Sequence, residues 1–124
     1  MPTSRKEIAL AFLRAVFAGN AREAQQKYLA TGFRHHNAFF PADPESLLRG
    51  MEENAAKFPN KTMDVKRALE DGDFVAVHSH VRMNPGDHGV AVVHLFKFQA
   101  DRIAEFWDVI QPVPDNLPNA NGMF

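Results

Sequence analysis

The first sixty residues carry apolar side chains at the spacing of helices. Ser4 followed by Glu7 forms a capping box, and an apolar stripe with helical period follows it. Gly19 ends this helix, and a second, shorter helix should run to about Leu29. Because so little chain links the two helices, we expect them to cross at an angle.

A third helix is predicted between two proline signals. Asp43 as N-cap and Pro44 at the first helical position mark its start, and Pro59 stops it. The segment 31–37, which precedes it, is short and reads as extended. The order so far is helix, helix, short strand, helix.

Beyond Pro59 the apolar positions recur with the period of strands. Met63, Val65 and Leu69 mark the first strand, and Asp71-Gly72-Asp73 is a hairpin turn. Prolines follow the last predicted strand, so we expect one domain over residues 1–114 and an extended tail over 115–124. The fold class is α+β, with a curved antiparallel sheet wrapped on three N-terminal helices. The remaining predicted strands cover residues 74–83, 90–99 and 102–111.

Composition excludes several classes of function. The 124 residues suit one domain, and 14 Lys and Arg against 15 Asp and Glu argue against a nucleic-acid binder. The absence of Cys excludes disulfide scaffolds, thiolate zinc sites and cysteine nucleophiles. Arg14 interrupts the N-terminal apolar stretch, which we interpret as an amphipathic helix rather than a signal peptide. We expect a cytoplasmic protein that does not bind membranes.

Strand parity places His94 and Asp108 on one apolar face. Residues 90–99 and 102–111 form a hairpin, and a register in which paired numbers sum to 202 sets His94 opposite Asp108. The same register sets Phe98 opposite Ala104, whereas a sum of 200 or 204 would shift these partners. The pair is either a satisfied buried polar pair or part of a site. The other residues on this face of the hairpin are Val90, Val92, Phe96, Phe106 and Ile110.

Four further histidines form two pairs, and each pair has two interpretations. In residues 74–83 the face with Val77 and Ser79 is the better core face, which sends His78 and His80 to the far side. Alternatively both face the pocket and, with His36 or Asp108, hold a metal. His35 and His36 are consecutive, so at most one of them enters the pocket, and both could instead lie on a surface loop.

At this point the chain resembles a known family. The element order, HHN at 35–37, VAVHSHVR at 75–82, VAVVHLFKF at 90–98 and IAEFWDVIQPVP at 103–114 are similar to SnoaL-like polyketide cyclases. That family belongs to the nuclear transport factor 2-like superfamily, with ketosteroid isomerase and limonene epoxide hydrolase. The resemblance covers about residues 5–114.

The resemblance implies a cone-shaped α+β barrel with one deep pocket, usually in a homodimer. It also implies ring closure by aldol condensation without a cofactor, with an acidic residue as base. Asp108 matches the position that looks catalytic in the cyclases, and His36-Asn37 falls at a His-Asn element of this subgroup. The sequence departs from the family at His94, where relatives commonly carry Asp, and at Phe106, where they often carry His.

We therefore expect a small cofactor-independent enzyme that acts on a carbonyl compound by acid/base chemistry, as a cyclase or isomerase does. The alternatives are a non-catalytic ligand-binding or dimerisation domain and a histidine-based metal enzyme. We assign Asp108 as base, with His94 or His36 as acid or oxyanion donor. The ligand should be small and hydrophobic, and the outer sheet face with Val93, Leu95 and Trp107 should form a homodimer. The expected substrate-binding residues are Asn37, Val77, Ser79, Val92, Phe96, Phe98, Phe106 and Ile110.

Overall fold

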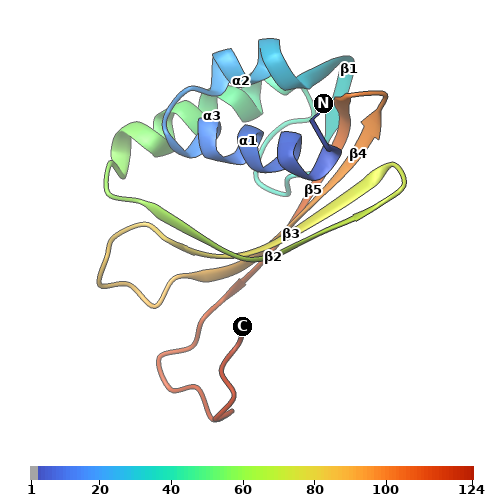
Figure 1. Ribbon diagram of the computed structural model, residues 1–124. Coiled ribbons are helices and arrows are strands. Elements are labelled where there is room, and N and C mark those ends of the chain that lie inside the picture. Colours follow the sequence, from blue (N-terminus) through green and yellow to red (C-terminus); the bar gives the residue numbers. More distant parts are fainter. Residues whose placement is uncertain (1–2) are drawn as a thin grey trace.

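A computed structural model, which describes residues 3–124, has three helices packed on one face of a five-stranded sheet (Figure 1). The layered α+β architecture predicted from the sequence is confirmed. The elements are α1 (Arg5–Phe17), α2 (Ala21–Tyr28), β1 (Leu29–His35), α3 (Pro44–Lys57), β2 (Thr62–Asp71), β3 (Phe74–Arg82), β4 (Val90–Gln99) and β5 (Arg102–Pro112).

The first and third helices begin at the predicted capping residues. The Ser4 side chain accepts a hydrogen bond from the backbone N–H of Glu7 at 3.1 Å. Asp43 accepts one from the backbone N–H of Ser46 at 2.8 Å, with a proline in the first turn of α3. Asn20 precedes α2, but its side chain makes no capping hydrogen bond.

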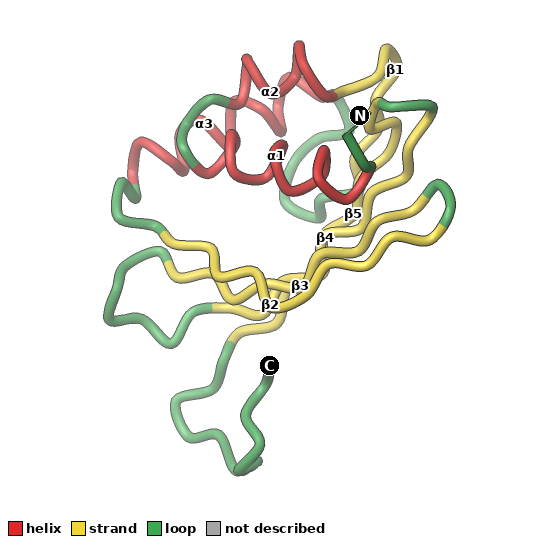
Figure 2. The backbone as a smooth tube through the Cα atoms, in the orientation of Figure 1, coloured by secondary structure: helices red, strands yellow, loops and turns green. Residues whose placement is uncertain are grey.

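The sheet has the strand order β1-β5-β4-β3-β2, so the last four strands form the predicted meander. The expectation of a purely antiparallel sheet is wrong, because β1 pairs parallel to β5. The helix α3 and the first three strands of the meander lie between β1 and β5, which gives the chain enough length for a parallel return. The sheet is therefore mixed and open, and it curves beneath the helices (Figure 2).

Two bulges change the predicted side-chain faces. In the β4–β5 hairpin the register shifts after Lys97, so Phe98 lies opposite Ile103 rather than Ala104. Ile103 thereby joins the core, where it is fully buried. A second shift, between Val65 and Arg67, turns Leu69 to the outer face, where 65% of it is exposed.

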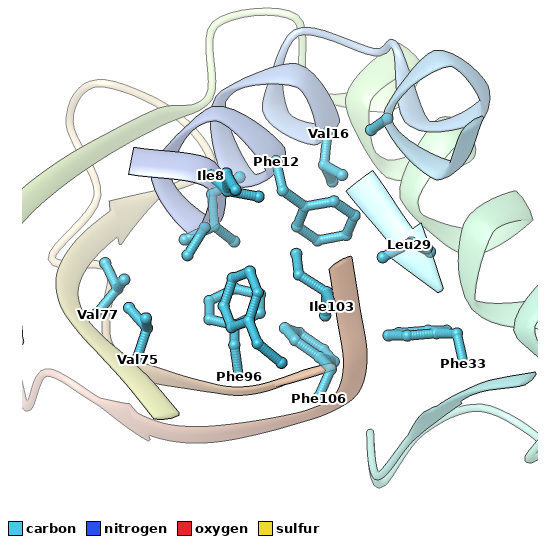
Figure 3. Packing of buried hydrophobic residues seen from close by; sticks show 14 of the residues in the cluster. Ile8, Phe12, Val16, Leu29, Phe33, Val75, Val77, Phe96, Ile103 and Phe106 are labelled. Atoms are coloured by element: carbon cyan, nitrogen blue, oxygen red, sulfur yellow. The ribbon is translucent and has the colours of Figure 1, made fainter. Parts of the chain in front are cut away.

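The core lies between α1 and the inner face of the sheet (Figure 3). Phe12 of α1 packs edge-on against Phe96 at 6.0 Å and Phe106 at 6.4 Å between ring centroids. Edge-to-face packing of this kind stabilises aromatic clusters beyond their area burial. This cluster fixes α1 over β4 and β5.

Residues 113–124 form no helix or strand and lie on the side of the sheet opposite the helices (Figures 1 and 2). The Phe124 ring stacks on His80 at 4.4 Å and on His78 at 5.6 Å between centroids. Both histidines therefore lie on the outer face, as the valine alternation predicted. Among the described residues, no helix has the length and apolar character needed to cross a membrane.

Candidate active site

A cavity of about 240 Å³ opens between α1, α3 and the inner faces of β3, β4 and β5. Its walls are mostly apolar, and its polar residues form two groups. The first group is Asn37, His94 and Asp108, and the second is Asn54 and Lys61. Its volume falls just below the range of typical small-molecule sites, which take roughly 300–1,000 Å³. The apolar wall consists of Leu13, Val16, Phe17, Phe39, Phe40, Leu47, Gly50, Met51, Val81, Met83, Val90, Val92 and Ile110.

From its apolar surroundings the His94–Asp108 pair is expected at the wall of the largest pocket, but this cavity is not the largest hollow in the described part of the molecule. Hollows of about 560 Å³ and 370 Å³ lie at the α2–β1 junction and beside α1. Their titratable lining residues are Arg102 in the first and Lys27, Tyr28 and Asp101 in the second. Only the 240 Å³ cavity combines buried acid/base groups with an apolar wall, so we take it as the candidate site.

Asp108 and Asn37 come together from opposite ends of the chain. The Asn37 side-chain amide donates to Asp108 Oδ2 at 2.7 Å. Asn37 is the second residue after β1, and its own Oδ1 accepts the backbone N–H of Phe39 at 2.8 Å. These two hydrogen bonds fix the amide, so its N–H points at the carboxylate.

His35 holds the loop that carries Asn37. Its Nδ1 accepts the backbone N–H of Asn37 at 3.2 Å, and its Nε2 pairs with the carbonyl of Pro41 at 2.9 Å. The His35 side chain is buried and bridges both ends of the turn. His35 is therefore a positioning residue that acts on Asp108 through Asn37.

Two opposing influences set the acidity of Asp108. Burial raises the pKa of its carboxyl, and the hydrogen bond from Asn37 lowers it. Burial is the larger cause, so the pKa lies above its ordinary value. A carboxylate whose pKa is raised in this way is a stronger base than one in water.

His94 is a neutral imidazole in the cavity wall. Burial lowers the pKa of His94 to about 4, so the ring carries no charge at neutral pH. Its Nδ1 is fully buried and has no hydrogen-bond partner within residues 3–124. A bare acceptor nitrogen costs less to bury unpaired than an N–H donor, which favours the proton on Nε2. That N–H is then free to donate to a molecule in the cavity.

The predicted register of the β4–β5 hairpin is confirmed at this level, because His94 lies directly opposite Asp108. Both side chains line the cavity. No direct hydrogen bond or ion pair joins them, however, and Asp108 bonds to Asn37 instead. His94 stacks against Phe106 at 5.6 Å and stays neutral, so it cannot serve Asp108 as an ionic partner.

His36 lies outside the cavity, so our placement of this residue beside the base is wrong. Its ring stacks on Trp107 at 5.0 Å, and its Nε2 contacts Glu105 Oε2 at 2.5 Å. Glu105 and Trp107 belong to the outer face of β5. The strand alternation that we predicted for the two consecutive histidines turns His35 inward and His36 outward.

Of the eight residues expected to bind substrate, three line the cavity: Asn37, Val92 and Ile110. The other five lie deeper in the core, because α1 packs directly on the inner face at their level and Phe12 fills the space above the phenylalanines. These buried residues shape the cavity from behind rather than reach into it. They are Val77, Ser79, Phe96, Phe98 and Phe106.

The residues of the metal alternative do not come together. His78 and His80 stack on Phe124 at the outer face, whereas Asp108 lines the cavity on the inner face. His80 Nε2 also pairs with the carbonyl of His88 at 2.8 Å. Within residues 3–124, no cluster of three or more His, Cys, Asp or Glu has the arrangement of a metal site.

A family model for the SnoaL-like domain matches residues 9–106. The chain belongs to the SnoaL-like family. No functionally curated protein sequence matches this SnoaL-like chain at a significant level. Its architecture is nevertheless shared by many solved structures.

Three of these structures show the range of SnoaL-like neighbours. An uncharacterised cystatin-fold protein from Novosphingobium aromaticivorans has 21% identity and a TM-score of 0.71, over 87% of this chain and 99% of that one. IdmH from Streptomyces antibioticus, a proposed polyketide cyclase, has 20% identity and a TM-score of 0.70, over 87% and 92%. A proposed ketosteroid isomerase from Kribbella flavida has 19% identity and a TM-score of 0.70, over 93% and 83%. At these identities the likeness establishes the cone-shaped nuclear transport factor 2-like fold alone.

Sequence reasoning missed several groups of this SnoaL-like cavity. Phe39 and Phe40 belong to a loop whose path has no periodic signal, and Lys61 follows the proline that ends α3. Gly50 lets Phe40 approach α3, because an added Cβ would lie 2.3 Å from the phenyl ring. An isolated Gly within a helical pattern was the one available hint of such a close approach.

Proposed function

We propose that this protein is a cofactor-independent enzyme that removes a proton next to a carbonyl group, as in an aldol cyclisation or an isomerisation. The observation that carries the proposal is the convergence of Asp108, a carboxylate with a raised pKa, and His94, a neutral imidazole, on one apolar cavity. Proton abstraction needs a base and a donor for the developing oxyanion. Membership of the SnoaL-like family supports the same chemistry.

In the proposed step Asp108 takes the α-proton and the electron pair of the C–H bond moves into an enolate. The enolate oxygen accepts the Nε2–H of His94 while that ring stays neutral. The enolate carbon then attacks a second carbonyl of the same substrate, or a different carbon of a conjugated enolate takes up the proton that Asp108 removed. Asp108 returns its proton to the product, so the protein ends as it began.

Asn37 keeps Asp108 usable as a base in this scheme. Its N–H orients one carboxylate oxygen and leaves the other free for the substrate. Because Asn37 lowers the pKa of Asp108 while burial raises it, the carboxylate stays ionised to a lower pH than burial alone would allow. His35 supports this arrangement from behind.

The experiment is α-proton exchange in D2O, followed by NMR over a panel of small cyclic and aromatic ketones. We expect exchange above the buffer rate for the wild-type protein and a loss of roughly 10²–10⁴ in Asp108→Asn, which keeps the shape and removes the base. Asp115→Asn is the matched control, since Asp115 is exposed and does not line the cavity. Equal exchange by wild type and Asp108→Asn would contradict the proposal.

The alternative is a binding domain that uses the same cavity without turnover. Such a domain would bind members of the panel but exchange none of their protons above the buffer rate. In that case Asp108→Asn and His94→Gln would change affinity only. Titration calorimetry beside the exchange assay separates these two functions.

We also propose a homodimer through the outer sheet face and a cytoplasmic location. The support for the dimer is apolar exposure on that face, at Leu69, Phe74, Val93 and Val109. Val109, which is 65% exposed, is the sharpest position for a test. Light scattering at micromolar concentration should give a dimer for the wild type and a monomer for Val109→Asp, and a wild-type monomer would contradict the proposal.

A further inference from the structure

The second group of polar residues in the cavity contains Lys61, which has no acidic partner within residues 3–124. Lys61 lies just before β2, and its Nζ contacts the side-chain oxygen of Asn54. The ammonium also sits over the Phe17 ring, 4.2 Å from its centroid. No carboxylate within residues 3–124 forms an ion pair with it, whereas Arg5, Arg22, Lys27, Arg49 and Lys66 each pair with one.

The surroundings of Lys61 make this cation costly unless an anion joins it. Burial lowers its pKa, and no other cause contributes. A half-buried ammonium that keeps only one amide and one aromatic ring as partners retains unused donor capacity. An anionic group in the cavity would supply the missing partner.

Lys61 lies far from the proposed base along the sheet. Val77 of β3 is the partner of His94, whereas Arg82 of β3 is the partner of Thr62, the residue after Lys61. The rise of a strand places these two levels about 17 Å apart along β3. The apolar wall, with Val81 and Val90, lies between them.

We infer that Lys61, together with Asn54, binds a carboxylate at the far end of the substrate, so that the substrate is an oxo acid with an apolar spacer. A single ammonium next to a carboxamide matches one monoanionic carboxylate, whereas a phosphate calls for several donors. The inference rests on the proposed function for the carbonyl end, but it makes a separate claim about the acid end. Lys61 is then a specificity residue and takes no part in proton transfer.

Binding of octanoate and octanamide, measured by titration calorimetry, tests the acid end alone. These probes share a chain, differ in charge and carry no ketone. We expect the wild type to bind octanoate about tenfold more tightly than octanamide or better, as for a hydrogen bond to a charged group. Lys61→Met should abolish this preference, and Lys61→Arg should retain most of it.

Lys57→Met is the matched control, because Lys57 is exposed at the end of α3 and does not line the cavity. It should keep the wild-type preference, and circular dichroism should show that every variant is folded. Undetectable octanoate binding, equal binding of the two probes, or an unchanged preference in Lys61→Met would overturn the inference.

A second readout keeps this inference separate from the proposed function. Asp108→Asn should still prefer octanoate, because that residue lies at the other end of the cavity. With 7-oxooctanoate as an exchange substrate, Lys61→Met should raise KM about tenfold and leave kcat nearly unchanged. Absence of exchange with an intact octanoate preference would count against the proposed function and leave the carboxylate site standing.

Discussion

The side-chain amide of Asn37 lies 2.7 Å from Asp108 Oδ2, although 71 positions separate the two residues in the chain. The parallel pairing of β1 with β5 makes this contact, because it brings the end of β1 alongside the middle of β5. The amide opposes the effect of burial on the carboxyl. The pKa of the proposed base, which burial raises, is therefore lowered in part by a residue from the loop after β1.

Asn37→Ala should shift the pH dependence of proton exchange. Without the amide, the pKa of Asp108 rises further, since burial remains and the lowering hydrogen bond is lost. Only the carboxylate acts as a base, so the acidic limb of the rate profile should move to higher pH. Exchange rates between pH 4 and 9 measure the shift, with the exposed Asn116→Ala as control. A limb that stays in place would show that Asn37 does not tune Asp108.

His94 should make the protein less stable in acid. Its pKa falls from 6.5 to about 4 on folding, so the unfolded chain binds the additional proton in that range. The free energy of unfolding is highest above pH 6.5, where the ring is neutral in both states. It decreases as the pH falls toward 4. The loss should reach about 3 kcal/mol, which corresponds to the shift in pKa.

Urea unfolding at pH 4, 5, 6 and 7 measures this dependence in the wild type and in His94→Gln. The two proteins share every other titratable group, so the difference between the two curves isolates His94. We expect the variant to have the flatter curve. Parallel curves would mean that the His94 ring is charged, or hydrated, in the folded protein.

Gly50→Ala should narrow the cavity without unfolding the protein. Ala is favoured over Gly inside a helix by about 0.8–1.0 kcal/mol, which stabilises α3. The new methyl group, however, would lie 2.3 Å from the Phe40 ring, so that ring has to move. The expected result is an unchanged or slightly raised melting temperature with weaker binding of ketone ligands. A fall in melting temperature with unchanged binding would show that Phe40 cannot shift and does not control the cavity.

The sequence alone predicts the order of helices and strands and the pairing of His94 with Asp108. The alternation along residues 90–99 and 102–111, with a two-residue turn, predicts that His94 faces Asp108, and the structure has this register. It could not predict the bulge after Lys97, because that shift depends on the turn geometry, in which Ala100 adopts a positive φ of 53°. Parity alone therefore assigns Ile103 to the outer face, whereas the bulge brings it into the core.

The candidate site is likewise only partly predictable from the sequence. Strand parity indicates that one of His35 and His36 points inward, but choosing between them requires the pairing of β1 with β5. The depth at which α1 packs decides that Val77 and Phe96 are core while Val92 lines the cavity. Lys61 reaches the cavity only because α3 and β2 meet there, and local sequence carries no signal of that meeting.

The central claim is that Asp108 and His94 act on one substrate, and a double-mutant cycle on proton exchange tests it most directly. Exchange rates in D2O are compared for wild type, Asp108→Asn, His94→Gln and the double variant, with the melting temperature of each. We predict that each single change lowers the rate by roughly 10²–10⁴ and that the double change lowers it little further, because groups that act on one transition state are not additive. The melting temperature of Asp108→Asn should stay the same or rise, since a desolvated carboxylate is costly to bury. Wild-type exchange rates in the folded double variant would contradict the account.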